Sequence, residues 1–546
     1  MSEILNYLAP RLVMLLTVSP WIGVAAVGLL HRSGSASVLR SARFNAGVTA
    51  VFASVLGGYV IGTGIEHASG GEGFQAIRAI WKSGQPGATG LPWSIEFGFS
   101  VGVDSLNWPV LVWIPWLTAA VFLMLSERDA ARPGFCAGLL AIEGALLCVF
   151  AAQDALTFCM ASEGSLVLFW LMTGWYGGAD RRLAAGRYFR WQYTANLLWT
   201  LGIFALGLAA LWVQQEVRRD ARVVRFGWGD LAETLQRFTD RYIGSIEYWN
   251  GAALLLVVLI GATVVRAGLV PGHHWLTALL QEAPAAVAVL HLGAAGLIGG
   301  YAYLRCLAPL TASDQWGAGW LSCLGAISAL AGGLLSLAQT DLRKFAACWW
   351  LSLQGCVWVG MGTSVPIAQT SGWWALQSAV ASAAGLMFIV QALEQRFDVR
   401  GLDAIGGLAQ KHPRLAICGC LVLLPPLGSP SVARGVVDQW GQLTTLSAAP
   451  GLWWLALAGW LCTSWATIWL LERLFIGRWR GPLREPEFFA DDAAAASSPD
   501  APPWVAAEAR EILVQDLSWR ECQAIGLTLA VPAISWWAWT LAESLR

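Results

Sequence analysis

The stretch VVLIGATVVRAGLVPGHHWLTALLQEAPAAVAVLHLGAAGLIGGYAYLR, residues 257–305, decides the fold. It ends one long apolar run and contains another, and a helix that crosses a bilayer needs about 20 such residues. The first run meets Gly268, Pro271 and Gly272, residues that interrupt helices. We therefore predict two membrane-spanning helices here, the first of them broken.

The composition of the whole chain agrees with a membrane protein. Its 546 residues (58.6 kDa) are 56% hydrophobic and 13% charged, and the mean hydropathy is +0.56. Soluble proteins carry about 25% charged residues. This composition excludes a soluble enzyme and a disordered chain. The net charge of −1 excludes a nucleic-acid binder, because it offers no basic surface to phosphates. The eleven cysteines lie mostly in apolar runs without a CxxC pair, so we interpret them as small buried hydrophobes.

We predict an all-α, polytopic membrane protein with about fourteen transmembrane helices. The expected helix cores are residues 12–30, 44–65, 106–125, 134–152, 156–176, 192–214, 251–270, 284–304, 317–338, 345–363, 371–393, 414–433, 452–471 and 525–542.

Basic residues predict the orientation of these helices. The loops after the first, fifth and ninth spans contain Arg32, Arg40, Arg43, Arg181, Arg182, Arg187, Arg190, Arg343 and Lys344. The positive-inside rule places these odd-numbered loops in the cytoplasm, so both termini are expected outside. Loop 67–104 is acidic on balance and is expected outside as well. Loop 476–519 is expected inside, as a solvated linker or as a docking surface for a cytoplasmic partner.

Ionisable residues at membrane depth are expensive and are functional candidates by default. Glu143, Glu163, Arg266 and His291 lie within expected spans, and the link between spans seven and eight adds His273, His274 and Glu282. Metal-ligand spacing is missing among the histidines and cysteines, so no metal site is expected in this chain.

Glu163 and Arg266 are the natural partners among these charges. An isolated buried carboxylate takes up a proton, whereas a nearby cation keeps it ionised. Arginine stays protonated, so Arg266 is expected to bias a proton path whose carriers are the glutamates and the histidines. The alternatives are a static ion pair that fixes helix packing and, for His291, an ordinary core histidine.

A second interrupted helix lies five spans further on. The span that begins near residue 414 meets Pro425, Pro426, Gly428 and Pro430. Broken helices at matching places in two halves indicate an internal repeat with a transport path at its interface.

Several motifs resemble the antiporter-like subunits of respiratory complex I and of Mrp-type cation/proton antiporters. In residues 257–305, the family pattern P-x-H-x-W-L, then E-[AG]-P, is matched by Pro271, His273, Trp275, Leu276, Glu282, Pro284, Val287 and His291. AQTDLRKFAACWWLSLQG (338–355) resembles the family's Q-T-D-x-K-R segment, and VGVDSLNW resembles the start of its third helix. DALTFCMASEGS resembles its helix-5 segment, in which Glu163 occupies the position of the family glutamate.

The resemblance implies fourteen helices with two inverted five-helix repeats, in which helices 7 and 12 are broken. The expected parts are three N-terminal helices (1–130), a first repeat (131–305), a second repeat (306–475), the cytoplasmic loop (476–519) and a last helix (520–546). The lower-ranked members of an ion path are Asp341, Arg343, Lys344, Arg434 and Asp438.

Two departures from the family pattern narrow the prediction. Arg266 stands where the family has a lysine, which resembles the DabB-type membrane subunit of the bacterial inorganic-carbon (Dab) complex. The expected eleventh span, ALQSAVASAAG, lacks the family's histidines and lysine. The second half-channel is therefore expected to lack the family's titratable side chains, whereas the first keeps its charged residues.

The Dab resemblance implies a proton- or cation-conducting subunit in the bacterial inner membrane. It would be a transporter subunit without its own cofactor, and a large cytoplasmic zinc protein, DabA, would hydrate carbon dioxide to bicarbonate. Two alternatives stay open: a subunit of a respiratory, hydrogenase or Mrp-type complex, and a membrane scaffold whose ion path has decayed.

Overall fold

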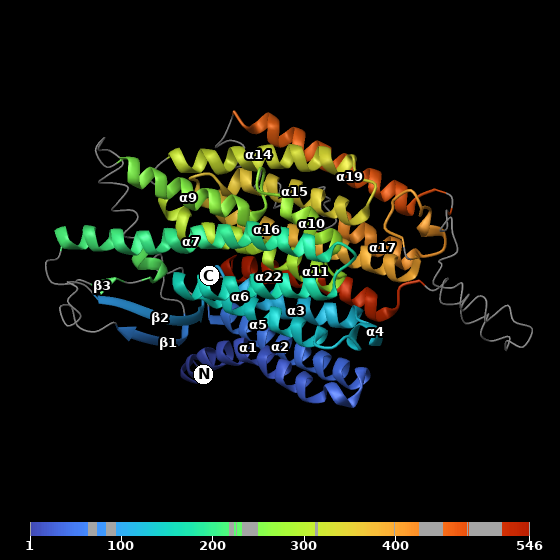
Figure 1. The fold of residues 1–546 in the computed structure, drawn as a ribbon, viewed down its shortest axis with the longest axis horizontal. Helices are drawn as coiled ribbons and strands as arrows, with labels where there is room; N and C mark the ends of the chain where they lie inside the picture. Colours follow the sequence, from blue (N-terminus) through green and yellow to red (C-terminus); the bar gives the residue numbers. More distant parts are fainter. Residues whose placement is uncertain are drawn as a thin grey trace, which may run out of the picture.

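The structure is a computed structural model. It describes residues 2–63, 74–82, 94–217, 223–224, 226–231, 249–311, 315–397, 399–424, 451–477, 479 and 516–544. As predicted, the described chain is predominantly helical, and most of the long helices run roughly alongside one another (Figure 1).

The helices fall close to the predicted spans. In the first third they are α1 (Ser2–Leu30), α2 (Ser35–Thr63), α3 (Trp108–Met124), α4 (Glu127–Ala130), α5 (Phe135–Ala151), α6 (Ala155–Tyr176) and α7 (Arg181–Val217). The middle contains α9 (Trp249–Ala267), α10 (His274–Glu282), α11 (Ala285–Gly293), α12 (Ile298–Ala302), a π-helical turn η3 (Tyr303–Leu307) and α13 (Ala308–Thr311). The last part contains α14 (Gln315–Leu337), α15 (Leu342–Met361), α16 (Pro366–Phe397), α17 (Pro413–Leu423), α19 (Trp453–Phe475) and α22 (Trp519–Ser544).

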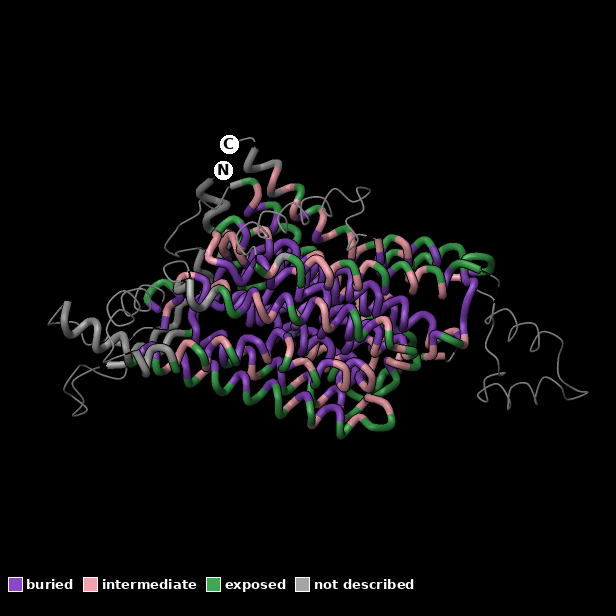
Figure 2. Tube along the Cα trace, turned by 90° about the horizontal axis from the view of Figure 1, so that it is seen from above, coloured by how far each residue is buried: buried purple, intermediate pink, exposed green. Residues whose placement is uncertain are grey.

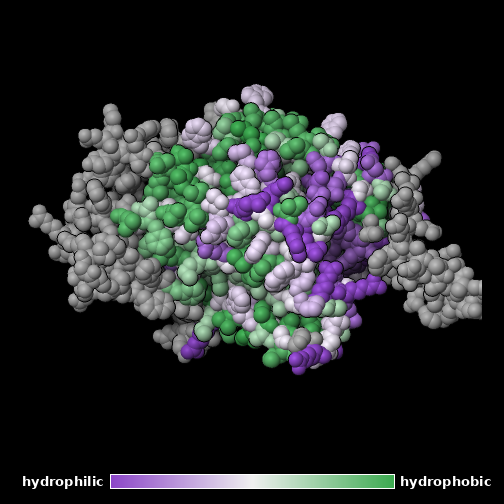
Figure 3. Space-filling view, viewed as in Figure 1, coloured by the Kyte–Doolittle hydropathy of each residue, from purple (hydrophilic) through white to green (hydrophobic). Residues whose placement is uncertain are grey.

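The chain is an integral membrane protein. Seven described helices are long and apolar enough to cross a bilayer by themselves, and shorter apolar helices pack among them. Hydrophobic side chains cover much of the surface in Figure 3, whereas hydrophilic ones gather toward the half that carries α4 and α17. A wide apolar surface is what a lipid-facing protein requires.

Helix α16 lies at the centre of the bundle. In the apolar stretch of α16, 94% is buried inside the protein, compared with 39% in α1 and 33% in Trp454–Phe475 of α19. Figure 2 shows the same arrangement, with buried backbone in the middle and exposed turns on the outer helices. Close approach needs glycine: a Cβ on Gly355 of α15 would lie 2.4 Å from the Ala329 nitrogen of α14.

A β-hairpin is the main departure from the all-α prediction. Strands β1 (Phe74–Lys82) and β2 (Ser94–Val103) pair antiparallel, and β3 (Val223–Val224) adds a short parallel edge to β2. The Asp154 carboxylate joins this sheet to the bundle, because it accepts hydrogen bonds from the Ser100 nitrogen (3.0 Å) and from the Thr157 nitrogen at the start of α6 (2.7 Å). Loop 67–104 is therefore partly a sheet.

Several of the odd-numbered loops meet at one end of the molecule. One polar pocket is lined by Asp129 in α4, Gly177 after α6, Glu282 at the end of α10 and Arg400 after α16. The hairpin lies at the opposite end (Figure 1). The loops that line the pocket and the hairpin therefore lie at opposite ends of the bundle.

The predicted break of the seventh span is present. Helix α9 ends at Ala267, α10 begins at His274, and Gly268 between them has a φ of +75°. The predicted break of the twelfth span, at Pro425 and beyond, lies outside the described residues.

The described ends of loop 476–519 are both attached to the start of α17. The Asp516 carboxylate accepts hydrogen bonds from the backbone nitrogens of Arg414 (2.7 Å) and Leu415 (3.1 Å), and Gln410 donates to the Gly477 carbonyl (3.0 Å). The first amides of a helix have no partner within it, so Asp516 acts as a cap supplied from about a hundred residues away.

Asp516→Ala should lower the thermal midpoint of the detergent-purified protein, because two helix amides lose a charged acceptor worth about 1 kcal/mol. Buried cysteines make a thiol-reactive dye a suitable reporter of unfolding. The matched control is Asp403→Ala, since Asp403 is 67% exposed in its pair with Arg473 and exposed pairs contribute little. Equal midpoints for the two variants would contradict the capping role.

Candidate functional site

The site is built around the break between α9 and α10. A break frees backbone groups that must find partners within the membrane. Here the second half of the chain supplies them: the Val270 nitrogen donates to the Ser328 hydroxyl of α14 (2.9 Å), and the Gln354 amide of α15 donates to the Gly268 carbonyl (3.4 Å). The break is thus held by helices far away in sequence.

Arg266 lies in the last turn of α9, directly before the break, and is 7% exposed. Its guanidinium donates to the Asn196 side-chain oxygen of α7 (2.7 Å) and to the Ser162 hydroxyl of α6. The Ser162 hydroxyl also lies 3.1 Å from the Asn196 oxygen. One buried cation therefore joins three helices through neutral acceptors.

The expected ion pair between Glu163 and Arg266 is not formed among the described residues; this part of the sequence interpretation is wrong. Ser162 occupies the position facing Arg266, and the next residue of a helix is rotated by about 100°. Glu163 is half-buried and still close enough for a Coulombic interaction with Arg266. The carboxylate is a neighbour of the cation and not its direct partner.

His291 is brought to the same region. It lies in α11, is 4% exposed, and its ring is surrounded by those of Phe169 (4.9 Å between centroids), Tyr188 (5.4 Å) and Trp275 (5.4 Å). Its Nδ1 atom has no hydrogen-bond partner in the described part of the chain.

The structure places three other candidates on α5 and at the start of α10. Glu143 is fully buried in α5, and neither of its carboxyl oxygens has a hydrogen-bond partner among the residues that the structure describes. His273 and His274 mark the start of α10 with their rings 4.3 Å apart, the first half-buried and the second exposed.

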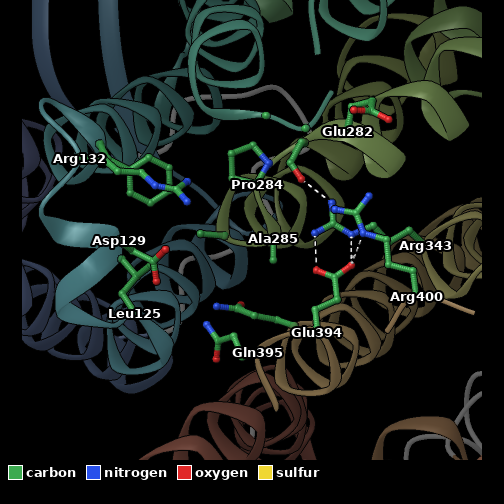
Figure 4. A pocket seen from close by; sticks show the side chains of 16 residues that line it. Leu125, Asp129, Arg132, Glu282, Pro284, Ala285, Arg343, Glu394, Gln395 and Arg400 are labelled. Carbon is green, nitrogen blue, oxygen red and sulfur yellow. Dashed lines mark hydrogen bonds and ion pairs between the residues drawn. The ribbon is translucent and has the colours of Figure 1, made fainter. Parts of the chain in front are cut away.

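The second group of candidates surrounds the polar pocket, a space of about 220 Å³ between α4, the end of α10 and α16. Figure 4 shows Arg343 between a carbonyl group near Pro284 and the carboxylate of Glu394. Glu282 lines the same pocket, and its carboxylate accepts a hydrogen bond from the Asp180 nitrogen (3.1 Å).

Arg343 is the most strongly held charge of the pocket. Its Nε and Nη2 atoms each lie 2.6 Å from one oxygen of Glu394, and Nη1 donates to the carbonyls of Ala283 (2.5 Å) and Leu280 (3.2 Å). Arg400 adds a second cation 3.2 Å from Glu394. A bidentate, charge-assisted pair of this kind fixes geometry as well as charge.

The remaining lower-ranked candidates divide between local structure and undescribed chain. The Asp341 carboxylate caps α15 by accepting from the nitrogens of Arg343 (2.9 Å) and Lys344 (3.0 Å). Arg434 and Asp438 lie outside the described residues.

The sequence interpretation missed the polar residues that bind the charges. Ser162, Asn196 and Glu394 were not selected, although Asn196 is a polar residue inside an apolar helix and Glu394 an acid at the end of one. Within the described ranges, no three His, Cys, Asp or Glu side chains are grouped to hold a metal ion.

Comparisons with known proteins identify the family to which this arrangement belongs. Residues 152–465 match the family described as "NADH:quinone oxidoreductase/Mrp antiporter, TM". The chain belongs to this family. Its members of this type are antiporter-like membrane subunits, and the specific Dab assignment gains no support from the match.

Among its relatives in the family is "F(420)H(2) dehydrogenase subunit M" of Methanosarcina mazei. The two are 28% identical over 385 residues, which cover 69% of this chain and 74% of that protein. Among solved structures, respiratory complex I from Thermus thermophilus with bound NADH gives a TM-score of 0.70 at 20% identity, covering 98% of this chain and 100% of the matched chain. The Mrp complex from Dietzia sp. DQ12-45-1b gives 0.72 at 16% identity, covering 98% and 96%. Both structures show the fold that the family shares.

Asn196→Ala should lower the thermal midpoint more than Asn45→Ala does. The first variant removes an acceptor from a buried guanidinium, and hydrogen bonds to charged groups contribute about 1.5–3 kcal/mol. The second removes a neutral hydrogen bond from Asn45 to the Ser19 carbonyl (3.0 Å), worth about 0.5–1.5 kcal/mol. The measurement is thermal unfolding of both purified variants, and equal decreases would show that Asn196 is an ordinary packing residue.

Proposed function

We propose that this chain is an ion-conducting membrane subunit of a multi-subunit complex of the complex I-like or Mrp type, and that the ion is the proton. The observation that carries the proposal is a buried, permanently charged guanidinium, Arg266, at the end of a broken helix with Glu163 beside it. Family membership supports it.

Glu163 is the proposed proton carrier. Arginine does not release its proton, so Arg266 acts as a fixed positive charge that favours the ionised form of a nearby carboxylate. A small movement at the break changes the separation of the two groups and hence the proton affinity of Glu163. His291 and Glu143 are further proposed carriers, because both are buried and titratable.

The polar pocket is proposed as the cytoplasmic end of this path. The basic loops lie at that end, so the positive-inside rule assigns it to the cytoplasm and both termini to the outside. Glu282 and the histidine pair stand between the pocket and the break along α10. The proposed membrane is the bacterial inner membrane, and the proposed repeats are residues 131–305 and 306–475.

Glu163→Gln should abolish ion flux and leave the protein folded, because the amide cannot carry a proton. Flux is measured in proteoliposomes with an internal pH-sensitive dye and an imposed pH gradient. Glu472→Gln, at an exposed position near the end of α19, is the matched control and should keep wild-type flux. Normal flux in Glu163→Gln would remove Glu163 from the path.

A second candidate function is the ion-conducting subunit of a Dab-type inorganic-carbon complex. One observation favours it: Arg266 stands in place of the family lysine. Its proposed partner is a large cytoplasmic zinc protein that hydrates carbon dioxide and docks on loop 476–519.

Affinity purification of the chain from its native host in mild detergent separates the two candidates. Membrane subunits that contain iron and flavin are the expected result for a redox-driven complex, and further antiporter subunits the result for an Mrp type. A single large soluble partner that contains zinc would instead support the Dab type. Mass spectrometry and metal analysis of the purified complex give the answer.

A further inference from the structure

An apolar pocket opens on the membrane-facing side of the break. Its volume is about 440 Å³, and its walls come from α7, α9, the break and α14. The lining includes Trp191, Ile260, Val264, Pro271, Gly272 and Trp320. Val257 and Trp320 are 57% and 58% exposed, so the pocket is open to its surroundings.

Hydrocarbon is the material that suits this pocket. Its lining consists of apolar side chains and glycines, which offer water no hydrogen-bonding partners, and such cavities stay dry. A gap left unfilled would forfeit dispersion contacts along its walls. The walls belong to helices at membrane depth, so acyl chains are the nearest hydrocarbon.

Two arginines next to the pocket supply a charge that a lipid can match. Arg187, Arg190 and Trp191 stand at i, i+3 and i+4 on α7, which is one face of the helix. All three are exposed, and no carboxylate forms an ion pair with either arginine among the described residues. Arg187 lies about 6 Å from Trp191 along the helix axis, toward the end with the basic loops. Its long side chain can reach the interface.

We infer that this face binds an anionic phospholipid. Its phosphate lies on Arg187 and Arg190, and one acyl chain follows Trp191 into the pocket and packs against Pro271 and Gly272. This acyl chain fills the space beside the break and limits the positions that the break can adopt. The binding site stands independently of the proposed function; its effect on ion flux rests on that function.

Photo-crosslinking tests the site. The protein is reconstituted into phosphatidylcholine vesicles that contain a few per cent of phosphatidylglycerol with a diazirine on its acyl chain, and labelled peptides are mapped by mass spectrometry. Labelling should concentrate on Trp191, on Trp320 and on the α9 residues of the pocket, above the level on the exposed face of α2. Equal labelling of α2 and α9 would overturn the site, since it would reflect bulk lipid only.

Gly261→Phe is the variant that fills the pocket. A Cβ at Gly261 meets no atom within 4 Å, and the residue lines the pocket, so the backbone accepts a side chain there that takes up part of the pocket. Labelling of the pocket should fall about tenfold, as the loss of roughly two buried methylene groups would give. Gly58→Phe in α2 is the matched control, because Gly58 is also exposed and also free of atoms within 4 Å. Unchanged labelling in Gly261→Phe would show that the acyl chain does not occupy this pocket.

The headgroup contact has its own test. Replacing Arg187 and Arg190 together by glutamine should reduce pocket labelling by the phosphatidylglycerol probe more than labelling by a phosphatidylcholine probe, because the choline cation of the second lipid offsets its phosphate charge. The control pair is Arg128→Gln with Arg182→Gln, which removes the same charge from exposed positions, Arg182 being about 180° from Trp191 around α7. Equal losses with both probes would overturn the preference for an anionic lipid, and no loss with either would overturn the phosphate contact.

A photo-crosslinking amino acid in place of Trp191 or Trp320, used in native membranes, identifies the occupant. Crosslinks from the pocket to lipid alone support the site, and a protein crosslinked at Trp191 or Trp320 would show a partner helix there and overturn it. Ion flux of Gly261→Phe, compared with Gly58→Phe, should fall if the lipid supports the break. Reduced labelling with unchanged flux would overturn the coupling, independently of any result at Glu163.

Discussion

The burial of one guanidinium constrains the rest of the structure. Removing a charge of this size from water costs several kcal/mol, so the protein must surround it with acceptors. Arg266 obtains two of them from Ser162 and Asn196, and it lies in the last turn of α9, where the terminal carbonyls of a helix carry partial negative charge. Because α9 ends within the membrane, that charge is available next to the cation. The broken helix and the arginine therefore depend on each other.

The position of Arg266 also depends on the second half of the chain. Ser328 and Gln354 bind the break, and both residues stand on helices that pack closely because glycines allow it. A Cβ on Gly332 of α14 would lie 2.4 Å from the Ser352 nitrogen of α15. This tight pair of helices offers the break a rigid support. A shift of α14 or α15 would therefore move the break, and the arginine next to it, through two hydrogen bonds.

The sequence predicted the helices well because long apolar runs report on membrane spans directly. It could not identify the partner of Arg266, since Ser162 and Glu163 are adjacent and a helix start uncertain by a few residues cannot tell which one faces α9. The pairing of Arg343 with Glu394 spans 51 residues and has no local signal. The hairpin was predictable, because Ile95, Phe97, Phe99, Val101 and Val103 alternate with other residues as strand residues do.

Helix α10 is fixed at both of its ends, which limits where the chain can move in the proposed ion transfer. Near the break, the Trp275 indole donates to the Val265 carbonyl (3.1 Å). At the far end, Arg343 binds the Leu280 and Ala283 carbonyls and is itself held by Glu394 on the central helix α16. A rigid shift of α10 would have to disrupt a buried bidentate ion pair, and leaving such a charge unpaired costs about 3–5 kcal/mol. The six residues between α9 and α10 have fewer constraints, since they are held by two neutral hydrogen bonds from the second half. We therefore expect any movement that alters the surroundings of Arg266 to be concentrated in this short segment, which directly follows that residue.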